Sequence, residues 1–261
     1  TGCSDAASMN VTFNSVPTPL FTVDKTCINQ ITEFTDASTI VTGTITAWFW
    51  DFDDAAASST LQNSTHQFSA AGTYQVKLVV TSNFGCKDSV TIPITVDPKP
   101  TVDFTFANVC ENDVTQFTDG STIGSGAVNT WRWDFDGLGA SALQNPTFTF
   151  PAAGTYNVKL VSGSGVGCLD SITKPITIIA NPTADAGADQ DICPGTSVQI
   201  GVTPVAGFTY SWTPTAGLSS STDANPIATP TTPTTYTVVI TETATGCSDA
   251  ASMNVTFNSV P

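Results

Sequence analysis

Apolar and polar residues alternate with a period of two along many segments of the chain. The clearest apolar face comes from alternate positions of the segment 74–80: Tyr74, Val76, Leu78 and Val80. Segment 156–160 repeats this pattern, and glycines that suit a turn, Gly72 and Gly154, precede the two segments. Side chains of a strand alternate between its two faces, so the pattern predicts half-buried β-strands and an all-β fold.

Two levels of internal repeat organise these predicted strands. Residues 1–17 are identical to residues 245–261, an offset of 244, so we expect one period of a longer array plus an overlap. Inside the period, Trp50-Asp51-Phe52-Asp53 recurs as Trp133-Asp134-Phe135-Asp136, and segment 69–78 recurs at 151–160. Tyr210-Ser211-Trp212 begins a looser third copy. One third of 244 is about 81 residues, the size of a small immunoglobulin-like β-sandwich.

The repeats divide the chain into three predicted immunoglobulin-like (Ig-like) β-sandwich domains. We expect a last strand of a preceding unit at 1–17, followed by domains at 18–98, 99–181 and 182–261. Short proline-containing joints separate them and limit independent tumbling. Three such domains predict an extended rod on the order of 100 Å per period, from strands that rise about 3.3 Å per residue.

Charge narrows the choice of partners. Lys and Arg number 7 against 22 Asp and Glu, which gives a net charge of −15. A polyanion would be repelled, so we expect neither nucleic acid nor an anionic membrane surface as a partner. No apolar run approaches the roughly 18 residues of a membrane span, and membrane insertion is not predicted. Because Thr1 is not an initiator, we expect a processed protein or an excerpt.

Six of the seven cysteines fall into three pairs of similar spacing. The pairs are Cys27 with Cys86, Cys110 with Cys168, and Cys193 with Cys247, which are 59, 58 and 54 residues apart. The spacing predicts three disulfides inside the domains, formed in an oxidising compartment and each adding about 3 to 4 kcal/mol. Buried reduced cysteines are the alternative. Cys3 is the equivalent of Cys247 and would belong to a preceding unit.

The quoted motifs resemble a known family. Segment 50–53, followed by Asn63-Ser64-Thr65-His66-Gln67-Phe68 and by segment 72–78, resembles the PKD (polycystic kidney disease) domain, an Ig-like sandwich. The second unit matches as well. The third unit lacks Asp-Phe-Asp and is similar to the PKD-like Ig repeats of large Bacteroidota surface proteins. The resemblance implies extracellular modules that space, link or adhere, often attached to enzymes without being catalytic.

Chemistry-bearing residues are few. His66 is the sole histidine, and Phe148 occupies its place in the second unit, so we expect a structural role and no enzyme activity. No cofactor is expected other than Ca²⁺, for which carboxylates are the preferred ligands. The calcium candidates are Asp51, Asp53, Asp54, Asp134, Asp136, Asp185, Asp189 and Asp191. Capping of turns by these carboxylates explains the same residues.

Aromatic residues and modification motifs complete the candidates. Trp50, Trp133 and Trp212 align and are predicted to lie in the cores, with Trp48 and Trp131 on the same faces; a carbohydrate-binding platform is the alternative. Ser89 and Ser171 resemble O-glycosylation sites of Bacteroidota secreted proteins. Three Asn-x-Thr sequons begin at Asn10, Asn63 and Asn254.

Together these features predict a structural repeat of an extracellular or cell-surface fibre, with copies of itself as partners. The stalk of a giant adhesin that meets glycans or matrix, and an accessory region of a secreted hydrolase, are alternatives. In a further alternative, residues 1–17 complete a unit of an adjacent subunit by strand addition, with a cross-link through Cys3.

Overall fold

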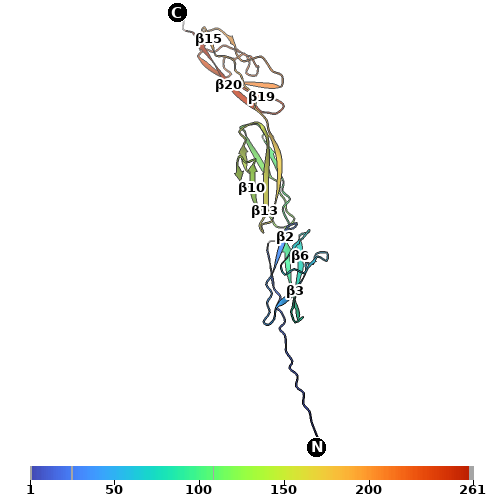
Figure 1. Ribbon diagram of the computed structural model, residues 1–261. Helices are drawn as coiled ribbons and strands as arrows, with labels where there is room; N and C mark the ends of the chain where they lie inside the picture. Colours follow the sequence, from blue (N-terminus) through green and yellow to red (C-terminus); the bar gives the residue numbers. More distant parts are fainter. Residues whose placement is uncertain (1, 25, 108, 259–261) are drawn as a thin grey trace. The chain divides into compact units, whose positions relative to one another are not determined.

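The computed structural model describes residues 2–24, 26–107 and 109–258 (Figure 1). These residues form antiparallel strands arranged in six sheets, with one parallel pair in the third sandwich. Among them, no helix has the length and apolar character needed to cross a membrane. The all-β prediction is therefore confirmed, and the sheets form three successive sandwiches along the chain.

The first sandwich pairs a three-stranded sheet with a four-stranded sheet, drawn from blue to cyan in Figure 1. The smaller sheet has the order β1 (Phe21–Val23), β2 (Ile31–Asp36), β5 (Ser64–Gln67). The larger sheet has the order β4 (Ser58–Ser59), β3 (Ile45–Asp51), β6 (Gly72–Ser82), β7 (Lys87–Val96). The period of two is visible in β6, where Val76, Leu78 and Val80 are buried and Gln75 and Lys77 are exposed.

The second sandwich repeats this arrangement. One sheet has the order β12 (Thr147–Thr149), β9 (Val114–Asp119), β8 (Phe104–Ala107). The other has the order β11 (Ala140–Ser141), β10 (Val128–Phe135), β13 (Gly154–Ser164), β14 (Leu169–Ile178). The same burial alternation recurs in β13, as the repeat of its sequence predicts.

The third sandwich is built differently at its edges. Its larger sheet has the order β15 (Gln190–Ile192), β20 (Ser248–Phe257), β19 (Thr234–Glu242), β17 (Phe208–Thr213). Its smaller sheet contains β16 (Val198–Gln199) and β18 (Ile227–Ala228). Because β15 pairs in parallel with β20, the start of this sandwich is joined to its last strand.

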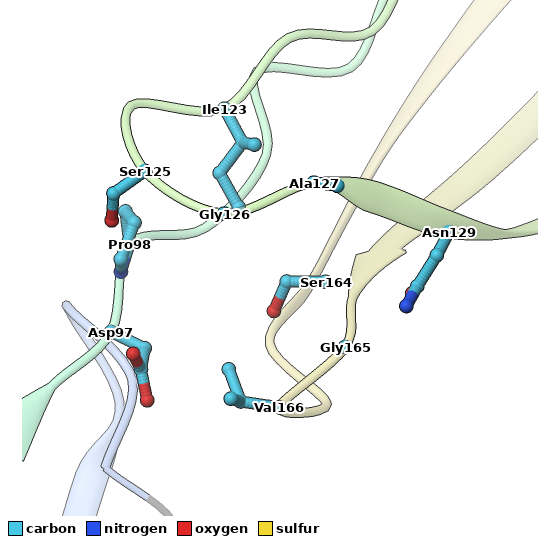
Figure 2. Close-up of a pocket in the computed structure, with 10 residues that line it drawn as sticks. All are labelled: Asp97, Pro98, Ile123, Ser125, Gly126, Ala127, Asn129, Ser164, Gly165 and Val166. Atoms are coloured by element: carbon cyan, nitrogen blue, oxygen red, sulfur yellow. The ribbon is translucent and has the colours of Figure 1, made fainter.

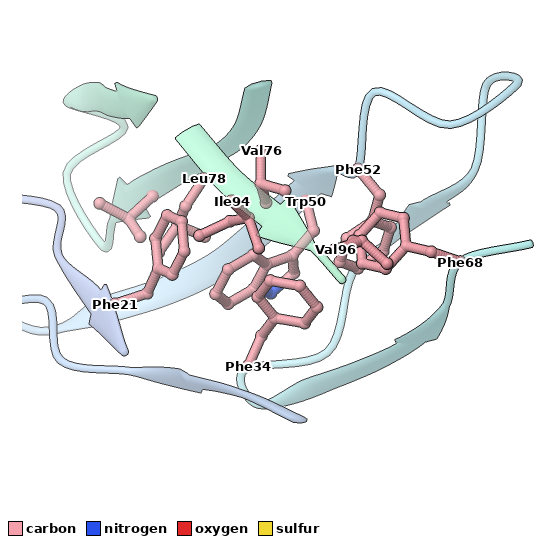
Figure 3. Packing of buried hydrophobic residues seen from close by; sticks show 10 residues of the cluster. Phe21, Phe34, Trp50, Phe52, Phe68, Val76, Leu78, Ile94 and Val96 are labelled. Atoms are coloured by element: carbon pink, nitrogen blue, oxygen red, sulfur yellow. The ribbon is translucent and has the colours of Figure 1, made fainter. Parts of the chain in front are cut away.

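Aromatic side chains fill the core of the first sandwich (Figure 3). Phe34 of β2 contacts Trp50 of β3 and also Phe52, with ring centroids 5.7 and 5.1 Å apart. Phe117 contacts Trp133 and Phe135 in the second sandwich at 5.5 and 5.2 Å. Large buried rings supply most of the apolar burial that such small domains need.

Two compact units make up the chain, and the second sandwich contributes one end to each. Unit 1 contains Thr1–Phe104, Gly120–Arg132 and Leu160–Ile172. Unit 2 contains Thr105–Asp119, Trp133–Lys159 and Thr173–Pro261. The first sandwich thus lies in unit 1 and the third in unit 2.

One sequence adopts two structures in this chain. Residues 248–257 form β20, in which Met253 is 1% and Val255 0% exposed. In the identical segment at the start of the chain, residues 2–16 form no strand, and the equivalent Met9 and Val11 are 85% and 66% exposed. β20 pairs with β15 and β19, and this segment has no such strands beside it. Thr1 and residues 259–261 lie outside the described residues.

Candidate functional site

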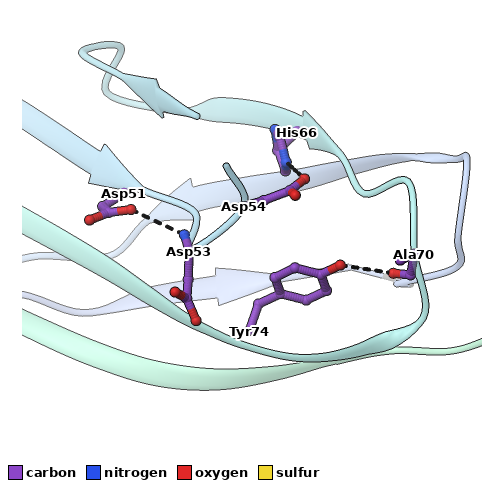
Figure 4. Close-up of polar contacts among 6 residues, drawn as sticks. All are labelled: Asp51, Asp53, Asp54, His66, Ala70 and Tyr74. Atoms are coloured by element: carbon purple, nitrogen blue, oxygen red, sulfur yellow. Dashed lines mark hydrogen bonds and ion pairs between the residues drawn. The ribbon is translucent and has the colours of Figure 1, made fainter. Parts of the chain in front are cut away.

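The Trp-Asp-Phe-Asp motif forms a turn whose carboxylates accept backbone hydrogen bonds (Figure 4). The Asp53 amide donates to Asp51 Oδ1 at 3.1 Å, and Asp53 Oδ2 accepts from the Gln75 amide at 2.9 Å. In the second sandwich the Gly137 amide donates to Asp134 Oδ1 at 2.8 Å. Asp53 and Asp136 both have φ values near +55°, a conformation that Asp tolerates better than most residues. These are the turn-capping contacts that the sequence also allows.

Calcium gains no support from this geometry. Among the described residues, no group of three or more His, Cys, Asp and Glu could hold a metal ion. Asp185 instead accepts from the Gly187 amide, and Asp191 from the Thr256 hydroxyl. Asp189 accepts both the backbone amide and the side-chain amide of Asn254, and these hydrogen bonds lower the pKa of Asp189. Calcium binding stays a prediction.

His66 is part of the aromatic packing in the first sandwich. Its ring stacks on Phe52 at 4.6 Å, and its Nε2 lies 2.8 Å from Asp54 Oδ2. Phe148 stacks on Phe135 at 4.3 Å in the equivalent place of the second sandwich. The phenylalanine makes the same stacking contact, so packing accounts for the position of the imidazole ring.

The three aligned tryptophans lie in the cores, as predicted. Trp50, Trp133 and Trp212 are at most 2% exposed. Each indole N–H donates to a backbone carbonyl at 2.8 to 2.9 Å: those of Leu61, Leu143 and Asp223. Trp48 is half-buried and donates to Asp36 Oδ2, and Trp131 is also half-buried. The buried tryptophans are therefore not a carbohydrate-binding platform.

The modification candidates are accessible. Ser89 and Ser171 are exposed at the starts of β7 and β14, and each backbone amide is bonded to the preceding aspartate. Asn10, Asn63 and Asn254 are exposed as well. Glycosylation at any of these residues stays a prediction.

The two cysteines of each of the first two sandwiches lie far apart, near opposite ends of one strand. In the first sandwich Cys86 precedes β7, whereas Cys27 forms a β-bridge with Asp97, which follows β7. The second sandwich is built in the same way, since Cys168 precedes β14 and Cys110 bridges to Ile179. A strand of 10 residues is about 33 Å long, at about 3.3 Å per residue. The two cysteines of one sandwich thus lie at opposite ends of its last strand.

This separation makes the predicted pairing inside the domains wrong. A disulfide requires Cα atoms about 4.4 to 6.8 Å apart, which the two ends of a strand cannot offer. Cys27 is bonded to Cys168 instead, with the Cα atoms 5.7 Å apart. Cys110 is bonded to Cys247, with the Cα atoms 5.6 Å apart. The first cysteine of one sandwich therefore bonds the second cysteine of the next, and each bond lies within one compact unit.

Both disulfides are buried in ordered backbone. Cys27 is 1% and Cys168 0% exposed, and the Cys168 sulfur lies 3.9 Å from the Asp97 carbonyl oxygen. Beside Cys110, the Glu111 side chain accepts from the amides of Ala153 and Asn181. Each bond thus closes a joint where one strand end meets the hairpin turn of the next sandwich.

A pocket of about 240 Å³ adjoins the first of these joints (Figure 2). Asp97 and Pro98 of the joint form one wall, the loop around Gly126 a second, and Ser164 to Val166 of the β13–β14 turn a third. All of these residues belong to unit 1. Asp97 is the one carboxylate among its lining residues, and the hydroxyls of Ser125 and Ser164 are its other reactive groups.

Three cysteines carry free thiols in this structure: Cys3, Cys86 and Cys193. Cys3 and Cys193 are exposed, and Cys86 is partly buried. The predicted bonds of Cys86 to Cys27 and of Cys193 to Cys247 are both replaced by the pairing between sandwiches.

Comparison with solved structures finds single PKD domains and longer Ig-like arrays. The PKD1 domain of Vibrio anguillarum Epp is 23% identical, over 32% of this chain and 96% of that one, with a TM-score of 0.30. The PKD1 domain of the Vibrio cholerae metalloprotease PrtV is 28% identical, over 31% and 98%, with a TM-score of 0.30. The N-terminal eight Ig domains of DSCAM are 12% identical, over 94% and 37%, with a TM-score of 0.45.

A sequence profile described as the PKD domain matches this chain twice in succession. The matches cover residues 14–96 and 97–180, together well over half of the chain. They span the first two sandwiches, in which the buried tryptophan and the aspartate turn recur in the same places. This chain belongs to the PKD domain family.

Proposed function

We propose that the chain is a non-catalytic structural repeat of an extracellular or cell-surface fibre built from tandem PKD domains. The observation that carries the proposal is the pair of disulfides that join each sandwich to the next. Such bonds persist in oxidising compartments outside the cytosol. A bond between domains restricts the unfolded chain of both, and it also holds neighbouring domains together under tension.

The overlap of the two disulfides strengthens this argument. Along the backbone, Cys27 and Cys247 are separated by 247 − 27 = 220 residues. With both bonds intact, a shorter covalent route leads from Cys27 to Cys168, back over 168 − 110 = 58 residues to Cys110, and across to Cys247. At about 3.5 Å per residue, the limit of extension falls from about 770 Å to about 200 Å.

The contacts of the described residues give less support to the alternative functions. An adhesin stalk or the accessory region of a hydrolase would also consist of tandem domains. A glycan-binding repeat needs exposed aromatic or polar groups that converge on a ligand. Here the aligned tryptophans are buried, and aspartates of the two repeated turns accept hydrogen bonds from backbone amides. A spacing and linking role accounts for these contacts without a ligand.

Stretching of single molecules from the two ends of the chain tests the proposal. The variant Cys86→Ser, Cys193→Ser keeps both disulfides and removes the two thiols from disulfide exchange. We expect its fully stretched length to increase by 220 − 58 = 162 residues on reduction, or about 570 Å. The matched control, with Cys168→Ser and Cys247→Ser, should reach the longer length without reductant.

Equal lengths with and without reductant would argue against a covalent brace between domains. Binding of the oxidised chain to an array of glycans, with an affinity that survives physiological salt, would favour the adhesin instead. Neither measurement depends on the thiols of Cys86 and Cys193.

A further inference from the structure

The two disulfides follow the same pairing pattern. Two of the free cysteines, Cys86 and Cys193, are the ones whose partners in this pattern lie outside the chain. Each bond joins the first cysteine of a sandwich to the second cysteine of the following sandwich, 141 and 137 residues further on. Cys193 is the first cysteine of the third sandwich, and Cys86 is the second cysteine of the first. Within residues 1–261, the partner that this pattern assigns to Cys193 would lie in a sandwich after the third, and that of Cys86 in a sandwich before the first.

Cys193 shares two backbone features with the two bonded first cysteines, although Pro194 has no amide for the bond that Ile28 and Glu111 donate after Cys27 and Cys110. The carbonyl of the residue before it, Ile192, accepts from the Asn258 amide at 3.0 Å. The carbonyls of Thr26 and Val109 accept in the same way from the residues that follow β7 and β14. The turn that begins at the cysteine is also shared. The residue two positions after the cysteine has a positive φ in every case: Asn29, Asn112 and Gly195. The carbonyl of each of these cysteines accepts from the amide three residues further on, at 3.1 to 3.3 Å.

Cys86 is held in the hairpin turn that holds Cys168. The Cys86 amide lies 3.2 Å from Ser82 Oγ, and the Cys168 amide lies 3.3 Å from Ser164 Oγ. The Ser82 amide donates to the Cys86 carbonyl at 2.9 Å, as the Ser164 amide does to that of Cys168 at 3.0 Å. Gly85 and Gly167 precede the cysteines with φ values of +79° and +89°. Both halves of a joint are thus preformed.

We infer that Cys193 forms a disulfide with Cys86 of the following copy of the first sandwich. The series of disulfides between successive sandwiches, here called the disulfide ladder, would then continue from one 244-residue period to the next. The partner cysteine would stand at position 86 + 244 = 330 of a continuous array, and 330 − 193 = 137 residues separate the two. This equals the separation of Cys110 and Cys247. The inference rests on the proposed repeat array and specifies how its periods are joined.

The identical terminal segments support a following copy at that place. Residues 245–261 are the sequence that precedes Thr18, where the first sandwich begins. A new first sandwich would thus follow β20 with the same joint that precedes it here. In such an array Met9 and Val11, exposed here, take the places of Met253 and Val255, which are buried in β20. The joint also keeps the two thiols at high effective concentration.

The bond forms by oxidation of two thiols. The Cys193 thiolate attacks a sulfur of an external disulfide, such as that of a thiol-disulfide oxidoreductase, and releases one thiolate of the oxidant. The Cys86 thiolate then attacks Cys193 in the mixed disulfide and releases the second. Two protons and two electrons leave the cysteine pair, and the oxidant ends as a dithiol.

Peptide mapping tests the inference on the full chain continued by a second copy of residues 18–98. Cleavage before aspartate places every cysteine of the array on its own peptide, with Cys193 in 191–222 and Cys86 in 54–87. Cys3 and the first Cys86 are replaced by Ser, as is the second Cys27, so that Cys86 of the added copy is the remaining partner. We expect a linked pair of 191–222 with 54–87, which dithiothreitol separates.

The two known bonds serve as internal standards, because they link 24–35 to 136–169 and 103–112 to 223–248. A matched chain that keeps Cys86 in the first copy and carries Ser in the second should give no link to 191–222 within a monomer. The Cys193→Ala version, with the added Cys86 also replaced by Ala, establishes by thermal unfolding that the added sandwich folds without the bond.

Cys193 linked to the peptide 223–248, or left as a thiol while both standards form, would overturn the inference. The stretching experiment is independent of this result, because its variant lacks Cys86 and Cys193. The disulfide between periods can therefore be disproved by peptide mapping while the stretching experiment still supports the two disulfides within a period.

Discussion

The sulfur of Cys27 is bonded to that of Cys168, 141 residues further along the chain, and not to the sulfur of Cys86 in the same sandwich. Both bonded residues are buried, so the cross-link belongs to the packed joint and not to the solvent-facing surface. It ties the stability of the second sandwich to that of the first, because the bond limits how far the chain of one sandwich can spread when it unfolds.

Removal of this bond should destabilise two sandwiches at once. A closed loop of 141 residues corresponds to about 5 kcal/mol in the chain-entropy view of disulfides. We expect Cys27→Ser with Cys168→Ser to lower the calorimetric transitions of the first and second sandwiches and to leave that of the third nearly unchanged. Cys86→Ser is the matched control. An unaltered pair of transitions would contradict a bond between the two domains.

The ring at position 66 should matter more than its charge. His66 stacks on Phe52 where Phe148 stacks on Phe135 in the next repeat. We expect His66→Phe to keep the free energy of unfolding of the first sandwich within about 1 kcal/mol, whereas His66→Ala should lower it by about 2 kcal/mol. Chemical denaturation of the two variants decides between them. Equal losses would indicate that the contact with Asp54, and not stacking, gives His66 its role.

Gly201 of the third sandwich should resist substitution for a steric reason. Its φ is +81°, and a Cβ atom there would overlap the backbone carbonyl of Ala224. Gly207 has a φ of +88° with nothing within 4 Å of such an atom. We expect Gly207→Ala to cost about 1 kcal/mol from backbone strain and Gly201→Ala about 3 kcal/mol or more. Thermal unfolding measures both, and similar costs would mean that strain alone acts at both glycines.

Asp189 should give the third sandwich an acid-dependent contribution to stability. Hydrogen bonds from the backbone and side chain of Asn254 hold the pKa of Asp189 below 3.8, its ordinary value. A carboxyl whose folded-state pKa is lowered stabilises the fold above the unfolded pKa, and this contribution disappears as the pH falls through the folded pKa. NMR titration should place the midpoint below 3.8, and Asn254→Ala should raise it. A midpoint that Asn254→Ala leaves unchanged would refute the side-chain contribution.

Much of the fold could be predicted from local patterns. The alternation of Val76, Leu78 and Val80 sets the buried face of β6, and the aligned Trp50, Trp133 and Trp212 lie in the cores. These properties depend on neighbours within one strand or one sandwich. The spacing of a repeated motif therefore captures them without any knowledge of how the domains meet.

The disulfide partners could not be read from spacing in the same way. Cys27 and Cys86 have the regular separation of a pair within a domain, yet the extended strand β7 holds them at opposite ends. A usable signal was present, since the strand pattern of residues 87–96 lies between Cys86 and the joint at Pro98. Proximity across a joint depends on tertiary structure, which sequence separation does not report.

The overlap of the cross-links also determines what a single proteolytic cut can do. Every peptide bond between Cys27 and Cys247 is spanned by at least one of the two disulfides, and those between Cys110 and Cys168 are spanned by both. A protease that hydrolyses any one of these bonds leaves the two fragments attached to each other. If the ladder continues through Cys193, the same redundancy extends along the whole array, and an isolated nick cannot sever the fibre.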